Sequence, residues 1–203
     1  MKRLGFLFKS CNPFNFLLKS SQENYLCGVN HYNMKTKTPK ESLTILTDIV
    51  LPGETNPLNY LFGGELLARM DRACSIAAQR HSRRIVVTAS VNHVAFSKAV
   101  PVGSVVIVEA KVSRAFSSSM EVYADVWIED RESGEKIKVN EGIYTFVAVD
   151  NTGSPVKVPP LQPETETEKQ RYDGALRRKQ LSLILSGKMK PNEAAELKAL
   201  FVN

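Results

Sequence analysis

Residues 55–71 read TNPLNYLFGGELLARMD, a loop that leads directly into a helix-favouring sequence. Two adjacent glycines, Gly63 and Gly64, stand where a loop of turn-forming residues meets a sequence that favours a helix. Small residues at a helix start leave backbone N–H groups uncovered, at the end where the helix dipole is positive. Asp71 follows inside the helix, and a carboxylate beside an apolar stripe is costly unless it has a partner or a function. The stretch therefore combines an open helix start with a partly buried acid.

A helical wheel over residues 64–82 separates one apolar face from a polar one. The apolar arc contains Leu66, Leu67, Met70, Ala73, Cys74, Ala77 and Ala78. Asp71 lies at the rim of this arc, while Arg69, Arg72 and Gln79 are expected to point elsewhere. Two interpretations of Asp71 stay open: an aspartate paired with an arginine at the edge of the core, or a general base held near a substrate.

The remaining pattern predicts one strand before the helix and four strands after it. The predicted strands cover residues 43–51, 85–96, 104–116, 119–130 and 136–150. In the fourth, apolar residues from Met120 to Ile128 alternate with polar or aromatic ones, as in a sheet with one dry face. Short turns between successive strands favour antiparallel pairing, with the helix covering the apolar face. The predicted class is α+β.

The two ends of the chain differ from this central pattern. Residues 1–33 are basic and aromatic without sustained periodicity, and they predict a disordered leader or a start of translation at Met34 rather than a targeting segment. The predicted domain covers residues 34–160. After a proline-rich exit, residues 161–203 form a charged, helix-favouring tail, in which 192–201 suggests a short amphipathic helix.

Composition excludes several classes of protein. No apolar run approaches the ~20 residues needed to cross a bilayer, so no membrane partner is expected. The net charge of +6 suits an anionic ligand such as a phosphorylated cofactor, or simply a basic surface, and does not demand nucleic acid. Cys11, Cys27 and Cys74 match no zinc or redox motif, which favours a reduced, cytoplasmic setting, with Cys74 as a buried small hydrophobe.

The three histidines form no catalytic or metal-binding pattern. His31 falls in the leader, His93 falls on a predicted strand, and His81 lies near the helix end, where a cation suits the dipole. Without a Ser-His-Asp set or a cluster of metal ligands, the sequence predicts neither a metal nor a separate cofactor.

The sequence resembles the acyl-CoA thioesterases of the YciA type, relatives of the cytosolic long-chain acyl-CoA hydrolases. Four segments carry the resemblance in order: TNPLNYLFGGELLARMD, VNHVAFSKAVPVGSVV, SSSMEVYADVW and YTFVAVDNTGSPVKVPP, across about residues 43–160. The resemblance implies a hot-dog fold, in which a curved five-stranded antiparallel sheet wraps a long central helix. It also implies a homo-oligomer, a dimer or a trimer of dimers (a hexamer), with the thioester at the junction of two subunits.

The resemblance also suggests site residues. Asp71 stands where the family has its catalytic carboxylate, and the Gly63-Gly64 helix start stands where the thioester carbonyl lies, with the Gly64 N–H as oxyanion donor. Relatives carry Asp or Asn just before the glycines, which makes Asn59 the candidate in the loop. Candidate contacts for the CoA phosphates are Ser118, Ser119, Lys98, Arg83, Arg84 and Lys157.

The expected function is hydrolysis of fatty acyl-CoA to free acid and CoA, with CoA as part of the substrate. Asp71 acts either as general base toward water or as a direct nucleophile that forms an anhydride. Two alternatives remain: an acyl-CoA sensor without turnover, and a hot-dog dehydratase, although no histidine lies near Asp71 in the sequence.

Overall fold

A computed structural model describes residues 34–201. The predictions for the leader, residues 1–33, fall outside the described residues. Two long helices and five strands account for most of the rest. In chain order, with three short 3₁₀ turns, they are η2 Pro39–Ser42, β1 Thr44–Ile49, η3 Pro52–Glu54, α1 Gly63–Ser82, β2 Ile85–Phe96, β3 Val105–Ala115, β4 Ser119–Glu129, β5 Lys136–Val149, α2 Glu166–Leu185, η4 Pro191–Glu193 and the single turn α3 Ala195–Lys198.

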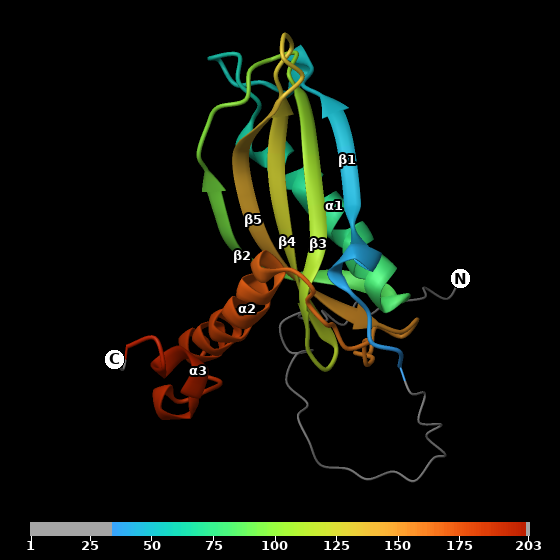
Figure 1. Ribbon diagram of the computed structural model, residues 1–203, viewed down its shortest axis with the longest axis vertical. Coiled ribbons are helices and arrows are strands. Elements are labelled where there is room, and N and C mark those ends of the chain that lie inside the picture. The colour runs from blue at the N-terminus through green and yellow to red at the C-terminus, as the bar shows by residue number, and fades with distance from the viewer. Residues whose placement is uncertain (1–33, 202–203) are drawn as a thin grey trace, which may run out of the picture. The chain divides into compact units, whose positions relative to one another are not determined.

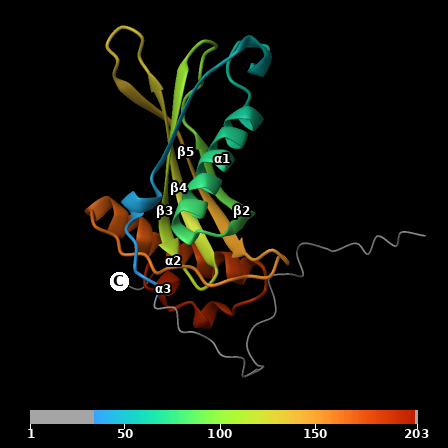
Figure 2. The ribbon, with the colours of Figure 1, turned by 90° about the vertical axis from the view of Figure 1, so that its right-hand side faces the viewer.

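The five strands form one antiparallel sheet, and α1 lies along one of its faces (Figures 1 and 2). The apolar residues of β4 are buried on the face toward α1: Met120, Val122, Ala124 and Val126. Met70, Ala73 and Cys74 meet them from the helix, and burial raises the pKa of the Cys74 thiol, which therefore stays neutral. The hot-dog fold and the predicted apolar helix face are both confirmed.

The order of the strands differs from a simple series of hairpins. The sheet runs β1-β3-β4-β5-β2, so β2 pairs with β5 at the far edge instead of with β3. The cause is α1, whose 20 residues extend about 30 Å and carry the chain from the β1 edge to the opposite edge. The segment between β2 and β3 then crosses the end of the sheet, and β3 pairs with β1 on one side and with β4 on the other.

Close packing of α1 on β5 fixes the helix beside Asp71. A Cβ atom at Gly142 would collide with the terminal methyl group of Met70, so a larger residue here would require the buried Met70 side chain to move. The Tyr144 hydroxyl donates to the Leu67 carbonyl at 3.4 Å. Asp71 follows Met70 directly, and its place along the sheet is therefore set by the core.

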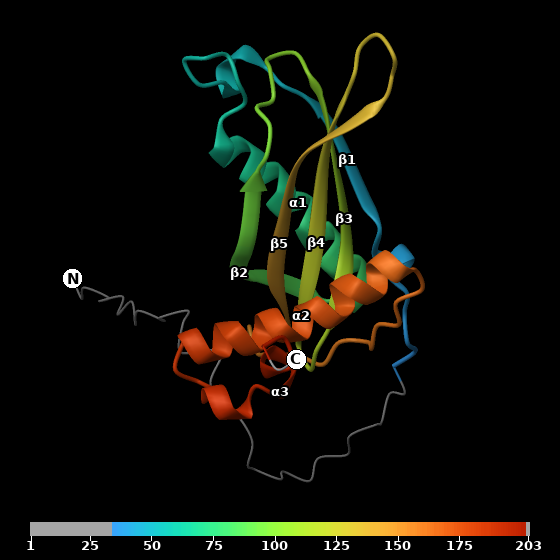
Figure 3. The same cartoon turned by 60° about the vertical axis from the view of Figure 1, so that its left-hand side comes forward.

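The C-terminal tail, with α2, packs on the sheet face opposite α1 (Figure 3). Arg178 of α2 donates to both carboxylate oxygens of Glu121, and Arg171 pairs with Asp125 at 2.8 Å; both acids belong to the outer face of β4. The predicted short helix at 192–201 is reduced to the four residues of α3, and Phe201 is exposed.

The expectation of a charged His81 at the end of α1 is wrong. The side chain is buried, and its Nε2 lies 2.8 Å from the Pro159 carbonyl oxygen. Burial lowers the pKa of His81 because a buried imidazolium would lose its hydration, and the neutral ring therefore serves as a packing residue.

Candidate active site

Asp71 lies where α1 meets the edge strand β2. Its Oδ1 accepts a hydrogen bond from the Thr88 hydroxyl at 2.9 Å, and the carboxylate is half-buried. Within residues 34–201 no arginine or lysine forms an ion pair with it. A structural arginine pair is thus excluded in the described chain, and one oxygen of a fixed carboxylate is left for another partner.

The start of α1 presents free backbone donors. The first helical bond is from the Leu66 amide to the Phe62 carbonyl at 3.1 Å, and Phe62 has no side-chain oxygen to cap the earlier N–H groups. Gly64 has an ordinary backbone conformation, and a Cβ there would meet nothing within 4 Å. Neither strain nor crowding inside the subunit therefore requires glycine at this position. Gly64 leaves the approach to the helix start open.

The loop before α1 holds Asn56 in one orientation. Its Oδ1 accepts hydrogen bonds from the Leu58 amide at 2.9 Å and the Tyr60 amide at 3.2 Å. Since both bonds use the oxygen, the Nδ2 group is the part of the amide that can donate to a ligand. Asn59 shapes the loop backbone instead, because it occupies the left-handed region at φ 59° and its carbonyl accepts from the Val102 amide.

Asp71 and the Gly64 amide stand apart on the same helix. Seven residues separate them, which is about 10 Å along the axis. A water held by the carboxylate and a carbonyl oxygen held by the amide require a shorter span. Within one subunit the two groups are therefore widely spaced for action on a single carbonyl carbon.

The edge strand β2 carries an unusual number of exposed apolar side chains. Ile85, Val87, Val91 and Phe96 are each about half exposed. A long apolar edge is a liability in a monomer, because its free backbone groups and side chains invite pairing. Such an edge indicates a surface that is covered in the assembled protein.

The predicted phosphate contacts fall at two ends of the subunit. Arg83 and Arg84 line an open cleft of about 680 Å³ at the C-terminal end of α1, together with Arg80 and Asp150. Arg83 adopts the left-handed conformation at φ 55°, which is uncommon for a residue other than glycine. The cleft is therefore basic, although Asp150 offsets part of its charge.

Ser118 and Lys157 flank the same end of the sheet. The Ser118 carbonyl accepts from the Ala148 amide at 2.9 Å, and the Ala148 carbonyl accepts from the Val156 amide. Ser119 opens β4 beside them. Lys98, in contrast, follows the other end of β2, where the ring of Phe96 lies against Gly63. Within one subunit the structure does not bring Lys98 to the arginines.

No group of three acidic, histidine or cysteine side chains in residues 34–201 is arranged to hold a metal ion. In the same residues, no helix is both long and apolar enough to cross a bilayer.

The fold is shared with a known class of proteins. Residues 58–135 match the model of the thioesterase superfamily. The acyl-CoA thioester hydrolase YkhA of Bacillus subtilis is 41% identical over 144 residues, which are 71% of this chain and 84% of the relative. The chain belongs to this family of hot-dog acyl-CoA hydrolases.

Solved structures agree with the assignment. The acyl-CoA hydrolase of Staphylococcus aureus, in complex with butyryl-CoA and CoA, has a TM-score of 0.70 at 33% identity; the match covers 81% of this chain and 99% of that one. An apo-hexameric acyl-CoA thioesterase has a TM-score of 0.69 at 38% identity, covering 72% and 94%. With the exposed β2 edge, these neighbours support a homo-oligomer.

Variants of the Staphylococcus aureus enzyme draw attention to Asn56 and Thr88. Structures exist with alanine in place of an asparagine, of an aspartate 15 residues later, and of a threonine 17 residues after that. Asn56, Asp71 and Thr88 repeat these residue types and both intervals. Sequence reasoning missed Asn56 and Thr88. An Asn-Pro turn and a threonine hydroxyl in a largely apolar strand were the available signals.

Proposed function

We propose that the protein hydrolyses fatty acyl-CoA to free fatty acid and CoA in the cytoplasm. Asp71, held by Thr88, removes a proton from a water molecule, whose oxygen then bonds to the thioester carbon. The carbonyl electrons move to oxygen, where the Gly64 N–H and the Asn56 amide stabilise the negative charge. When the carbonyl forms again, the C–S bond breaks and the CoA thiolate takes the proton from Asp71. The single observation that carries this proposal is the Thr88–Asp71 contact, which fixes a carboxylate without an ion pair in the described residues.

The acid and the oxyanion donors come from two subunits in this account. The two groups of one subunit lie about 10 Å apart along α1, and β2 offers an unpaired edge. Antiparallel pairing of two full β2 strands about a twofold axis sets the partner's Thr88 opposite His93. His93 is three residues from Phe96, whose ring touches Gly63. The partner's Asp71 then approaches the start of α1.

The CoA moiety binds through its phosphates to basic side chains in this proposal. Arg83 and Arg84 lie exposed in one cleft, with Ser118, Ser119 and Lys157 near the same end of the sheet. Pairing of the subunits also turns the Lys98 end of one β2 toward the Arg83 end of the other, so both groups of candidates serve one substrate. The dimer and its further assembly into a hexamer belong to the same proposal.

The alternative functions differ in what they require. A dehydratase of this fold needs a histidine at the acid, and within residues 34–201 the hydrogen-bond partner of Asp71 is Thr88. A sensor needs binding without turnover, and binding alone does not require the carboxylate that Thr88 fixes on α1.

A panel of acyl-CoA substrates of increasing chain length tests the function directly. Incubation with the full chain and a thiol-reactive dye is expected to release free CoA from at least one chain length. Binding of acyl-CoA without thiol release, at any chain length, would favour the sensor and contradict the hydrolase.

A further inference from the structure

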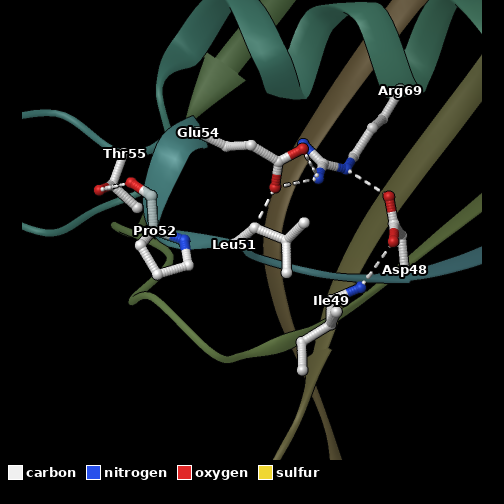
Figure 4. A network of polar contacts seen from close by, with 7 residues as sticks. All are labelled: Asp48, Ile49, Leu51, Pro52, Glu54, Thr55 and Arg69. Atoms are coloured by element: carbon white, nitrogen blue, oxygen red, sulfur yellow. Dashed lines mark hydrogen bonds and ion pairs between the residues drawn. The ribbon is translucent and has the colours of Figure 1, made fainter.

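Arg69 is the buried cation of α1. It is 4% exposed and lies two residues before Asp71, so the two side chains leave the helix about 200° apart. Asp71 faces β2. Arg69 faces β1 and the turn η3, as Figure 4 shows. The helix that carries the proposed base therefore also contacts the start of the loop that carries Asn56.

Two carboxylates meet this guanidinium. Arg69 Nη2 lies 2.8 Å from both oxygens of Glu54, and Nε lies 3.2 Å from Asp48 Oδ2. The amide of Leu51 donates to Glu54 Oε2 at 2.8 Å. This backbone bond and then the Arg69 guanidinium hold the pKa of Glu54 below its usual value. Glu54 is thus ionised at neutral pH, and its bonds to Arg69 are of the stronger, charge-assisted kind.

Glu54 lies at the position where the loop begins. Its carbonyl accepts a hydrogen bond at 2.9 Å from the amide of Phe62, the last residue before α1. Thr55 and Leu61 form a bridge directly above this bond. Residues 54–62 therefore form a closed loop with Asn56 inside it, and the side chain of Glu54 ties this loop to α1.

Stability alone does not explain the ion pairs that Arg69 forms with Glu54 and Asp48. Arg69 Nη1 is buried and finds no acceptor in the described part of the chain. An unsatisfied buried donor destabilises the folded state. Apolar side chains of similar volume often stabilise a core as well as a buried ion pair does. What the ion pair adds is a defined distance between the loop and the helix.

We propose that Arg69 is a positioning residue that acts through Glu54 on Asn56. The inference rests on the proposed function, since it assigns Arg69 to the geometry of the same oxyanion site. Because the loop faces the carbonyl and not the CoA phosphates, a loosened loop lowers kcat and leaves KM nearly unchanged. A misplacement of about 1 Å is enough to reduce turnover by up to about 100-fold.

The test is a double-mutant cycle on the full chain with the best substrate of the acyl-CoA panel. Glu54→Gln is expected to lower kcat about tenfold or more, with KM within about twofold. The double variant Glu54→Gln/Asn56→Ala is expected to match Asn56→Ala alone, because Glu54 acts through Asn56. Asp48→Asn is the matched control: it removes a carboxylate from the same arginine, but that side chain is 57% exposed and belongs to β1. Its effect on kcat is expected to stay below about twofold.

The outcomes separate this inference from the proposed function. If the fold-losses in kcat of the two single variants multiply in the double variant, the positioning of the loop is overturned and the hydrolase function still stands. A loss of kcat for Asp48→Asn equal to that for Glu54→Gln would have the same consequence. A wild-type chain that releases no CoA would overturn both. If Glu54→Gln does not fold, Arg69→Lys keeps the cation without the paired geometry, and it must show the same kcat-specific, non-additive loss.

Discussion

Replacement of Asp71 by asparagine is expected to lower kcat about 100- to 10,000-fold, the range that a general base contributes. The two side chains have nearly the same shape, and the amide oxygen can still accept from the Thr88 hydroxyl, so the fold and KM should change little. The amide cannot take a proton from water, and the reaction loses its base. Thiol release from acyl-CoA, measured beside a thermal melt of each variant, checks this result.

Asp173→Asn supplies the control for the loss of one negative charge. Asp173 lies exposed on α2, on the other face of the sheet, and it is expected to keep full activity. If Asp71→Asn retained most of its turnover while the melts agreed, the acid would be structural and another group would have to activate the water.

Two substitutions at Gly64 are expected to separate stability from catalysis. Gly64→Pro removes the N–H group in the first turn of α1, where proline is tolerated, and should lower kcat about 100- to 1,000-fold. Gly64→Ala keeps the N–H group and adds a methyl group that meets nothing within 4 Å in the subunit. It should raise the free energy of unfolding by up to about 1 kcal/mol and still reduce activity, because the methyl group enters the space of the substrate. Kinetics and denaturant melts of both variants measure the two effects.

The opposite pattern would contradict the proposed oxyanion site. An alanine variant that is more stable and fully active would mean that nothing approaches Gly64 in the working enzyme. A proline variant with normal kcat would show that the N–H group of Gly64 does not stabilise the oxyanion.

Most of the fold was predictable from local patterns. The alternation in β4 and the apolar arc of α1 are each visible in the sequence of that strand or helix alone, and both are confirmed. The place of β2 at the far edge was not predictable in this way. It depends on the length and direction of α1 across the sheet, which is a property of the assembled layers.

The candidate site shows the same division. The helical wheel placed Asp71 correctly at the rim, where it meets Thr88. It also placed Arg69 away from the core, but Arg69 is buried, because the end of β1 and the loop around Glu54 cover that side of the helix. A wheel describes one helix and contains no information about what covers its polar side. Asn56 was overlooked for the same reason, since its importance comes from the shape of its loop.

Mixing two inactive variants tests most directly whether the site spans two subunits. Asp71→Ala and Asn56→Ala each disable every site in their own homo-oligomers. If the acid and the amide come from different subunits, half of the dimers formed by unfolding and refolding an equal mixture contain one intact site. Activity should then return to about a quarter of the wild-type value. A refolded mixture no more active than its two components would contradict the two-subunit site, and the account built on it.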